Sequence, residues 1–256
     1  MPLEVGQHRG AVLHIMPQEP GSGAKMGISD SDVWIKEALG SLPQYVKVIN
    51  AITDPLPATI EEDAIVISGS VHSVYDGDPW IARLEDLVRR VPDGKKILGI
   101  CFGHQLIGQA FGGVVTRGKL GREIGVASIT LTPQGRQDKL FDGLPSRFSL
   151  ATSHADVIEQ MPLQATLYAW NGKYANQSFA IGDNIRTLQP HPEITCSIIS
   201  AIVRARENIL VREGVMQPDE LAQTLQRIES QKDQIQTNGK KIFENWMRYH
   251  VYGSEE

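Results

Sequence analysis

The sequence predicts an α/β fold with a mostly parallel central sheet and helices on both faces. Its 256 residues, 41% of them hydrophobic, suit one domain of normal core size with an appendage. In the first hundred residues, short apolar runs alternate with segments that carry apolar residues at helical spacing, which is typical of parallel sheets. Later strands are separated by turn residues, so a small antiparallel addition is expected there.

The first half of the chain supplies the parallel strands. Ser31 and Asp32 are suited to begin a helix that runs through Leu39. Pro79 favours the first turn of a second helix, whose apolar stripe ends at Val88. The strands expected before, between and after these helices are 11–15, 45–49, 64–67 and 97–100.

The second half is expected to contain the antiparallel strands and a helical end. Turns at Asn171-Gly172 and 182–184 separate the strands 126–131, 166–169 and 177–181, and a further strand covers 185–188. Beyond this we expect one domain over 1–206 and a helical extension over 207–256 packed on it. In that extension a helix should begin near Gln217-Pro218, and Asn238-Gly239 should separate it from a last helix.

Gly99-Ile100-Cys101-Phe102-Gly103 has the pattern of a nucleophile elbow, a sharp turn between a strand and a helix. The two glycines permit the tight turn and a close approach of backbones. A thiol at that position faces the unpaired N–H groups of a first helical turn, which favour the thiolate. A buried structural cysteine is the alternative, but the paired glycines favour a nucleophile. The pattern therefore indicates a cysteine enzyme.

A base and its orienting carboxylate are found at Gln189-Pro190-His191-Pro192-Glu193. Pro192 disfavours the helical region for His191, and residues two apart in extended backbone point to the same side. Glu193 can then orient the imidazole while His191 takes the proton of Cys101. A surface turn is the alternative for this proline-rich stretch.

These two motifs together resemble the class I glutamine amidotransferase family, in which a Cys on an elbow is followed much later by His-x-Glu. Arg122-Glu123-Ile124-Gly125 and Ser153-His154-Ala155-Asp156 resemble further segments of that family, and Ile67-Ser68-Gly69-Ser70 falls where it keeps a glycine-rich oxyanion loop. The resemblance runs from about Ala11 to the helix after Glu193. It implies a flavodoxin-like amidotransferase fold, attack on a γ-glutamyl amide, and a thioester that water hydrolyses.

The resemblance also assigns roles to residues around the triad of Cys101, His191 and Glu193. It implies that the oxyanion is met by backbone N–H groups, and that the glutamyl moiety meets one amide side chain and two backbone groups. The expected oxyanion residues are Gly69, Ser70 and Phe102, and the expected substrate-binding residues are Gln105, Ala155 and Asp156.

The other reactive residue types are expected to be structural. His104 and His154 are expected to be packed histidines. Arg122 and Glu123 are expected to form an ion pair or a loop brace, and Cys196 is expected to be a small buried residue without activation.

The loop Gly69-Ser70-Val71-His72 departs from the Gly-Gly-Pro that is typical of members which feed a synthase. It is more similar to stand-alone γ-glutamyl peptidases, which hydrolyse glutathione-like conjugates, and His72 would then lie at the mouth of the site. A glutaminase subunit that delivers ammonia to a separate synthase remains an alternative, as does a silent binding module on this fold. A hydrolase or chaperone of the intracellular-protease type fits less well. In that family a His commonly follows the Cys directly, whereas Phe102 follows Cys101 in this sequence.

Composition excludes several other classes. The net charge of −5 gives no polyanion-binding surface, so no nucleic-acid partner is expected. Residues 1–10 lack the apolar core of a signal peptide, and no apolar run approaches the ~20 residues of a membrane span. Two cysteines fit a reducing cytoplasm. We therefore expect a cytoplasmic protein with a small-molecule γ-glutamyl substrate, no cofactor, no metal and no membrane partner.

Overall fold

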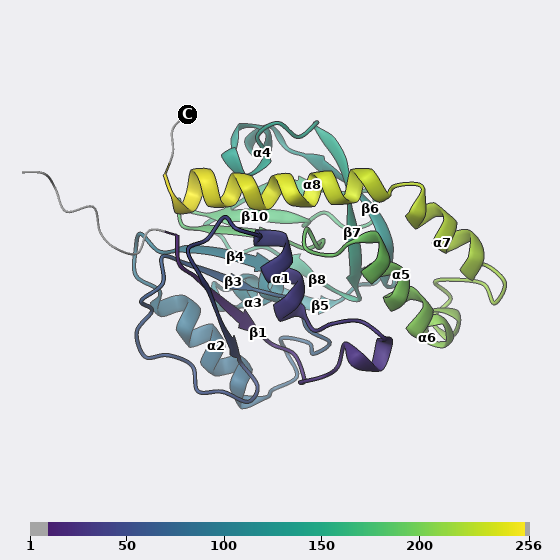
Figure 1. Ribbon diagram of the computed structural model, residues 1–256, viewed down its shortest axis with the longest axis horizontal. Coiled ribbons are helices and arrows are strands. Elements are labelled where there is room, and N and C mark those ends of the chain that lie inside the picture. The colour runs from purple at the N-terminus through teal and green to yellow at the C-terminus, as the bar shows by residue number, and fades with distance from the viewer. Residues whose placement is uncertain (1–9, 254–256) are drawn as a thin grey trace, which may run out of the picture.

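The computed structural model describes residues 10–253, and its central feature is one large sheet (Figure 1). Nine strands lie in the order β2-β1-β3-β4-β11-β10-β9-β6-β7, and β5 and β8 form a separate two-stranded sheet. Residues 1–9, where we expected no signal peptide, lie outside the described residues. Within 10–253, every helix is too short or too polar to cross a membrane.

The strands alternate with helices through the first half of the chain, as the sequence predicts. The strands are β1 Val12–Met16, β2 Val46–Asn50, β3 Ala64–Ile67, β4 Lys96–Ile100, β5 Val114–Arg117, β6 Glu123–Leu131, β7 Arg147–His154, β8 Asp156–Gln160, β9 Ala165–Trp170, β10 Ser178–Ile181 and β11 Ile185–Leu188.

The helices include two short 3₁₀ turns and a final π-helical turn. They are η1 Ala24–Met26, α1 Ser31–Leu39, α2 Pro79–Arg90, α3 Phe102–Ala110, α4 Pro133–Gln137, η2 Lys139–Phe141, α5 Cys196–Ala205, α6 Glu207–Arg212, α7 Leu221–Glu229, α8 Lys232–Asn245 and η3 Trp246–Val251.

The mixed sheet has a parallel half and an antiparallel half. Strands β2, β1, β3, β4 and β11 are parallel neighbours, whereas β10, β9, β6 and β7 continue the sheet in antiparallel pairs. The expected α/β class with an antiparallel addition is therefore confirmed. The carboxyl ends of β3, β4 and β11 meet at one edge of the sheet, where ligands bind in folds of this kind.

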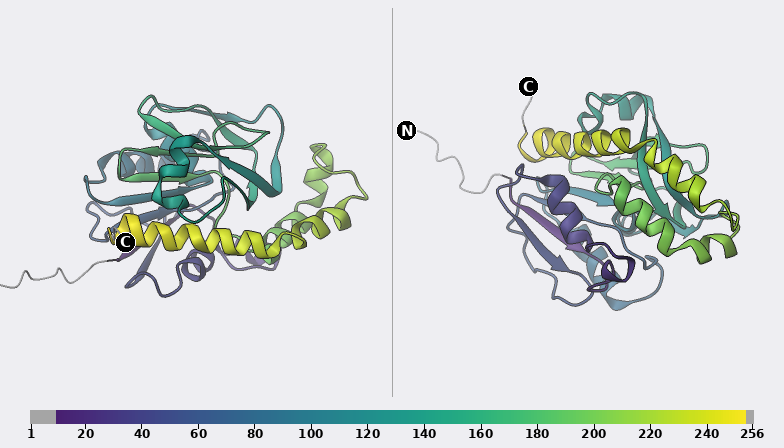
Figure 2. Two further views of the ribbon diagram at one scale, coloured as in Figure 1. Left: turned by 90° about the horizontal axis from the view of Figure 1, so that it is seen from above. Right: turned by 45° about the vertical axis from the view of Figure 1, so that its right-hand side comes forward.

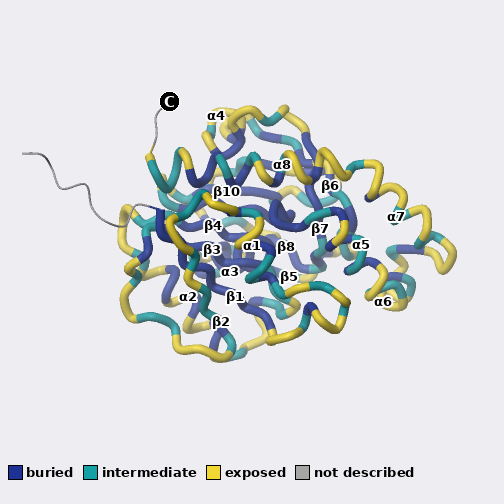
Figure 3. The backbone as a smooth tube through the Cα atoms, viewed as in Figure 1, coloured by how far each residue is buried: buried dark blue, intermediate teal, exposed yellow. Residues whose placement is uncertain are grey.

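Alternate residues of the parallel strands face two different hydrophobic cores. One core contacts α1 and α8, and the other contacts α2 and α3. In β3, for example, Val66 belongs to the first core and Ile67 to the second, as the two-residue period of a strand requires. Figure 3 shows the buried strands at the centre and exposed backbone at the rim. The apolar runs that predict these strands are buried on both faces.

The antiparallel part contains strands that the sequence patterns did not indicate. β5, β7 and β8 were not expected, although β7 is a long strand that pairs with β6 over eight residue pairs from Glu123↔His154 to Thr130↔Arg147. Most of β7 is buried, from Phe148 to Thr152. A strand buried on both faces lacks the polar and apolar alternation that makes a half-exposed strand visible in a sequence.

One helix prediction was wrong. Asn238-Gly239 does not separate two helices, since α8 continues through it. A Cβ atom added at Gly239 would lie 2.1 Å from the carbonyl oxygen of Pro192, and Asn238 Nδ2 donates to the carbonyl of Ser149 (3.0 Å). The pair that resembles a turn signal is instead where the helix touches the loop after β11. Glycine is needed at this position because the helix backbone approaches the loop backbone closely.

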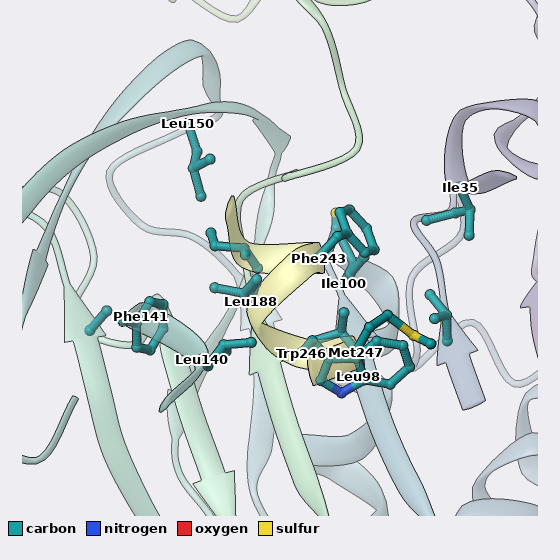
Figure 4. Packing of buried hydrophobic residues seen from close by; sticks show 14 of the residues in the cluster. Ile35, Leu98, Ile100, Leu140, Phe141, Leu150, Leu188, Phe243, Trp246 and Met247 are labelled. Atoms are coloured by element: carbon teal, nitrogen blue, oxygen red, sulfur yellow. The ribbon is translucent and has the colours of Figure 1, made fainter. Parts of the chain in front are cut away.

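The helices after residue 206 also contribute to the main core. In Figures 1 and 2, α8 lies along one face of the sheet. Phe243, Trp246 and Met247 pack with Leu98 of β4 and Leu188 of β11, as Figure 4 shows from close by. The division of the chain at residue 206 stays a proposal, but α8 and η3 share one hydrophobic core with the sheet that carries the site.

Gly239→Ala is expected to destabilise the protein and to lower its activity. Alanine in a helix is normally more stable than glycine by about 0.5–1 kcal/mol. Here the methyl group would meet the Pro192 carbonyl, so α8 or the loop must shift, at a cost of about 1–3 kcal/mol. Thermal unfolding measures the effect, at about 2–4 °C for each kcal/mol. Gly172→Ala is the control, because its Cβ would meet open space. An unchanged melting temperature in Gly239→Ala contradicts the prediction.

Candidate active site

Cys101 lies on a sharp turn between β4 and α3. Its φ is 53° and its ψ is −102°, and it is the only residue other than glycine with positive φ in the described part of the chain. Its N–H donates to the carbonyl of Leu188 in β11 (2.8 Å), and its carbonyl accepts from Gln105 N (3.0 Å). Such strain in a non-glycine residue is typical of functional turns, and the elbow pattern predicts this geometry.

The two glycines beside Cys101 are required by packing. A Cβ atom at Gly103 would lie 2.2 Å from the carbonyl oxygen of Ile67, so α3 touches the end of β3 directly. A Cβ atom at Gly99 would lie 2.5 Å from Ile107 Cδ1 and 2.7 Å from Gly103 O. Any side chain at either position would push the helix away from the sheet and move Cys101.

His191 and Glu193 face Cys101 from the loop after β11. His191 N donates to Ala151 O of β7 (2.8 Å), and this bridge fixes the backbone of the loop. The Nδ1 atom of His191 donates to Glu193 Oε1 (2.7 Å), since a carboxylate only accepts. The imidazole and the Cys101 side chain line the same pocket, and both lie beside Gly69. All three side chains are buried.

The environment of His191 favours its charged form. Burial lowers the pKa of His191, but the Glu193 carboxylate and the Cys101 thiolate outweigh it, so that the pKa lies above its ordinary value. The imidazolium therefore persists when the pH rises above 6.5. In a Cys–His–carboxylate set of this kind, the histidine accepts the thiol proton and thereby activates the sulfur as a nucleophile.

The glycine loop after β3 lies against the same two side chains. A Cβ atom at Gly69 would lie 2.8 Å from His191 Cε1 and 3.6 Å from Cys101 Cβ. Phe102 is the first residue of α3, so its N–H has no acceptor within the helix. The structure thus brings Gly69, Ser70 and Phe102 to Cys101, as the expected oxyanion assignment requires.

Two pockets meet at Cys101. The first, called the polar pocket here, has a volume of about 240 Å³. It contains Gln105, Ala155 and Asp156, the three residues expected to bind the substrate, and several cations. Its lining is Ser70, Val71, His72, Ser73, Cys101, Gln105, Arg117, Arg122, Ser153, His154, Ala155, Asp156, Arg206 and Ile209.

Gln105 and Asp156 are held in fixed positions. Gln105 Nε2 donates to the carbonyl of Asp156 (2.9 Å) and to Gln189 Oε1 (3.0 Å). The Asp156 carboxylate accepts from the hydroxyls of Ser73 and Tyr75, the latter at 2.8 Å. The Asp156 carbonyl thus binds Gln105, and its carboxylate holds the 73–75 loop. No sequence pattern indicated this second role.

The second pocket, called the apolar pocket here, has a volume of about 250 Å³ and adjoins the polar pocket, with which it shares Ser70, Val71, Cys101, Ser153 and Arg206. His191 and Glu193 line it, together with residues that no sequence pattern indicated, among them Lys25, Trp34 and Arg206. Its lining is Gln18, Ser22, Lys25, Met26, Ser31, Trp34, Gly69, Ser70, Val71, Cys101, Ser153, His191, Glu193, Ile194, Ile202 and Arg206.

Three further histidines near the site have neighbours or partners of their own. His104 is fully buried, hydrogen-bonds to Thr187 Oγ1 (2.8 Å) and has a pKa lowered to about 3, mainly by burial. His154 is packed between the Asp156 carbonyl and Glu123. Both are structural, as expected. His72 lines the polar pocket, with Asp78 Oδ2 3.6 Å from its Nδ1.

Arg122 and Glu123 each act as a brace, but not as a pair with one another. Arg122 binds Glu213 of the loop after α6 through Nε (2.8 Å), whereas Glu123 binds His154 and accepts from Asn171 Nδ2 (2.8 Å). Of the two expected roles, an ion pair or a loop brace, the structure shows the brace.

Cys101 is expected to react with iodoacetamide well before Cys196 at neutral pH. Cys101 lines both pockets, whereas the Cys196 thiol donates to Glu229 (3.1 Å), and burial together with that carboxylate raises the pKa of Cys196. A raised pKa leaves less thiolate at neutral pH, so labelling of Cys196 should increase only as the pH rises. Peptide mapping by mass spectrometry gives the order, and earlier labelling of Cys196 contradicts it.

The fold and site together define a class. A mostly parallel sheet presents a cysteine on a strained elbow, beside a buried His–Glu pair and two pockets, which is the arrangement of a cysteine-dependent acyl-transfer enzyme. The sequence profile of the glutamine amidotransferase class-I family matches residues 30–211. The chain belongs to this family, as the motifs predict.

Curated relatives include two groups of this family. γ-Glutamyl peptidase 4 of Arabidopsis thaliana is 35% identical over 144 residues, 55% of this chain and 57% of the relative. γ-Glutamyl peptidase 5 of the same plant is 32% identical over 178 residues, 68% and 70% of the two chains. GMP synthase [glutamine-hydrolyzing] of Borreliella burgdorferi is 34% identical over 155 residues, 60% of this chain but 29% of the synthase. The chain thus spans little more than half of the first relative.

Solved structures agree on the fold. A glutamine amidotransferase from Thermotoga maritima superimposes with a TM-score of 0.73 at 21% identity, covering 94% of this chain and 99% of the other. A glutamine amidotransferase from Methylobacillus flagellatus gives a TM-score of 0.74 at 21% identity, covering 93% and 94%. The amidotransferase fold expected from the motifs is confirmed.

Proposed function

We propose that this protein hydrolyses a γ-glutamyl amide bond through a γ-glutamyl thioester on Cys101. The observation that carries the proposal is the position of Cys101, on a strained elbow in one pocket with a buried imidazole whose Nδ1 binds Glu193. The similarity to γ-glutamyl peptidases supports the same reaction.

The reaction follows from the geometry in two halves. With the thiol proton already on His191, the Cys101 thiolate attacks the γ-carbonyl carbon, and the carbonyl oxygen becomes an oxyanion. The N–H groups of Phe102 and of the Gly69-Ser70 loop meet that charge, and losing one such donor costs about 3 kcal/mol in comparable sites. Collapse breaks the C–N bond, and His191 gives its proton to the leaving amine.

Hydrolysis of the thioester completes the cycle. A water molecule attacks the same carbonyl carbon while His191 takes one of its protons. The C–S bond breaks, the sulfur leaves as the thiolate beside the His191 imidazolium, and free glutamate is released. The imidazolium is stabilised by Glu193, whose Oε1 lies 2.7 Å from His191 Nδ1.

The polar pocket is the proposed site of the glutamyl moiety. Gln105, Ala155 and Asp156 line it, and Gln105 is fixed by two hydrogen bonds of its own amide. We propose that the Gln105 side chain and the backbone of Ala155 and Asp156 bind the α-amino and α-carboxylate groups. A fixed amide supports specificity, because it loses little side-chain freedom on binding.

A glutaminase that supplies ammonia to a separate synthase is the second candidate. The match to a GMP synthase favours it, because this chain corresponds to only 29% of that protein. A silent module is disfavoured because Cys101, His191 and Glu193 are all present and in contact. We further propose that residues 1–206 form the catalytic domain with 207–256 packed on it, and that the protein is cytoplasmic, where its two free cysteines stay reduced.

The test is an assay of the purified protein alone. Release of ammonia from glutamine and of amino acid from γ-glutamyl dipeptides should be measured without additives. We expect turnover of at least one of these compounds. Inactivity towards all of them, followed by activity when a co-purifying synthase is added, supports the ammonia-supplying alternative. Inactivity under both conditions removes the enzyme proposal.

A further inference from the structure

The two pockets divide the substrate at the scissile bond. Gln105 and Asp156 line only the polar pocket, and His191 lines only the apolar pocket. Under the proposed function, His191 protonates the leaving amine, so that amine must lie on the His191 side of Cys101. The apolar pocket is therefore on the leaving-group side of the bond.

The apolar pocket is much larger than ammonia requires. Its volume is about 250 Å³, whereas a water molecule, which is similar in size to ammonia, takes about 30 Å³ of liquid. Met26, Trp34, Ile194 and Ile202 give it apolar walls from four separate elements or loops. A space with such walls suits a leaving group that carries an apolar side chain.

Two cations of this pocket, Lys25 and Arg206, form no salt bridge within the described residues, and Arg206 also lines the polar pocket. Within residues 10–253, neither Lys25 nor Arg206 has a carboxylate at ion-pair distance, and the one acid in the pocket, Glu193, is bound to His191. Arg206 is half-buried, and its Nη1 donates to Ser153 Oγ (3.2 Å). Burial and the nearby Arg122 lower the pKa of Arg206, so an anion beside it would be stabilised.

The wall that carries Lys25 is held in place by its own hydrogen bonds. The Asp30 carboxylate accepts from the N–H groups of Gly21 (2.8 Å) and Gly23 (2.7 Å). Gln18 Oε1 accepts from Ser31 N (3.1 Å) and thereby connects the end of β1 to the start of α1. Lys25 therefore extends from a fixed loop toward the pocket that it lines.

We propose that the apolar pocket is a leaving-group subsite that selects amines bearing a carboxylate. The occupant is an α-amino acid or short peptide with an apolar side chain, and Arg206 and Lys25 bind its carboxylate. The proposal rests on the proposed γ-glutamyl hydrolysis and specifies its substrate: a γ-glutamyl amino acid or peptide is used in preference to glutamine.

The first experiment compares substrates that differ only in that carboxylate. The specificity constant kcat/KM is measured for γ-glutamyl-leucine and for γ-glutamyl-leucinamide. We expect the acid to be preferred at least about tenfold, the effect of one charge-assisted hydrogen bond. Arg206→Gln and Lys25→Gln should each reduce the acid-to-amide ratio severalfold. Arg212→Gln is the matched control, because Arg212 is an exposed arginine outside both pockets. Equal rates for acid and amide in the native protein overturn the proposal.

The second experiment needs no turnover, so that its outcome is separate from that of the proposed function. Labelling of Cys101 by iodoacetamide is measured in the presence of leucylglycine or leucylglycinamide, neither of which has a γ-glutamyl group. We expect the acid to slow labelling more than the amide does, and Arg206→Gln to remove the difference. If the protein hydrolyses nothing but this difference is found, the hydrolase proposal fails and the subsite remains. Equal protection by both compounds refutes the subsite.

Discussion

Cys101→Ala is expected to abolish hydrolysis of every γ-glutamyl compound, with a loss of at least about 10⁴-fold in kcat. We expect no other side chain of the two pockets to replace the sulfur, because His191 lies beside Cys101 and the Ser73 hydroxyl is held by Asp156 in the 73–75 loop. Without the thioester, only binding and the oxyanion donors remain, and these alone give weak catalysis of direct attack by water. Steady-state assays with glutamine and γ-glutamyl-leucine measure the loss.

Cys196→Ala is the matched control for this prediction. Both cysteines are buried and free, and each becomes alanine, but only Cys101 lies at the two pockets. Cys196→Ala should keep kcat within a few-fold, and thermal unfolding should show that Cys101→Ala is folded. Near-native hydrolysis by Cys101→Ala would remove both the triad and the proposed reaction.

The elbow could be predicted from the sequence because its requirements are local. A strand, a glycine on each side of Cys101 and a following helix lie in one continuous stretch, Lys96–Ala110, and the close packing at both glycines gives the pattern its physical reason. His191 and Glu193 could be predicted for the same reason, since Pro192 fixes the local backbone. No local pattern showed that the Cys101 elbow and the His191–Glu193 loop lie close together in space. That expectation came from the family resemblance.

The residues that the sequence did not indicate act through tertiary contacts. Lys25 and Arg206 lie far apart in the sequence, and both line the apolar pocket because η1 packs on α5. Gly239 was misread for a related reason: its neighbour Pro192 lies 47 positions earlier, and no pattern within one helix shows that a loop touches it. A local turn signal is therefore unreliable wherever a glycine serves close packing.

The C-terminal helix connects the fold to the chemistry. Gly239 of α8 contacts Pro192, which lies between His191 and Glu193, and Asn238 holds the Ser149 carbonyl of β7. The same strand, through Ala151, fixes the His191 backbone. The loop of the base is thus held from two sides, by β7 and by α8. Residues after 206 are expected to matter for turnover even though none of them is proposed as part of the triad.

Glu193→Gln is expected to lower kcat by about 10²–10⁴-fold and to move the alkaline limb of its pH profile toward lower pH. In the native protein, burial opposes the imidazolium, and the Glu193 carboxylate with the Cys101 thiolate keeps the pKa of His191 raised. A group whose pKa is raised keeps its proton until the pH passes that raised value. Without the carboxylate, burial lowers the pKa of His191 more effectively, so the imidazolium loses its proton at a pH about 1–3 units lower.

His191→Ala distinguishes this orienting role from that of the base itself. It should lose at least about 10⁴-fold, close to the loss in Cys101→Ala, because nucleophile and base act as a unit. Profiles of kcat against pH for the native protein and Glu193→Gln, with His191→Ala as the lower bound, measure both effects. If Glu193→Gln keeps the native alkaline limb, then the 2.7 Å contact to Nδ1 does not set the protonation of His191, and the carboxylate serves packing alone.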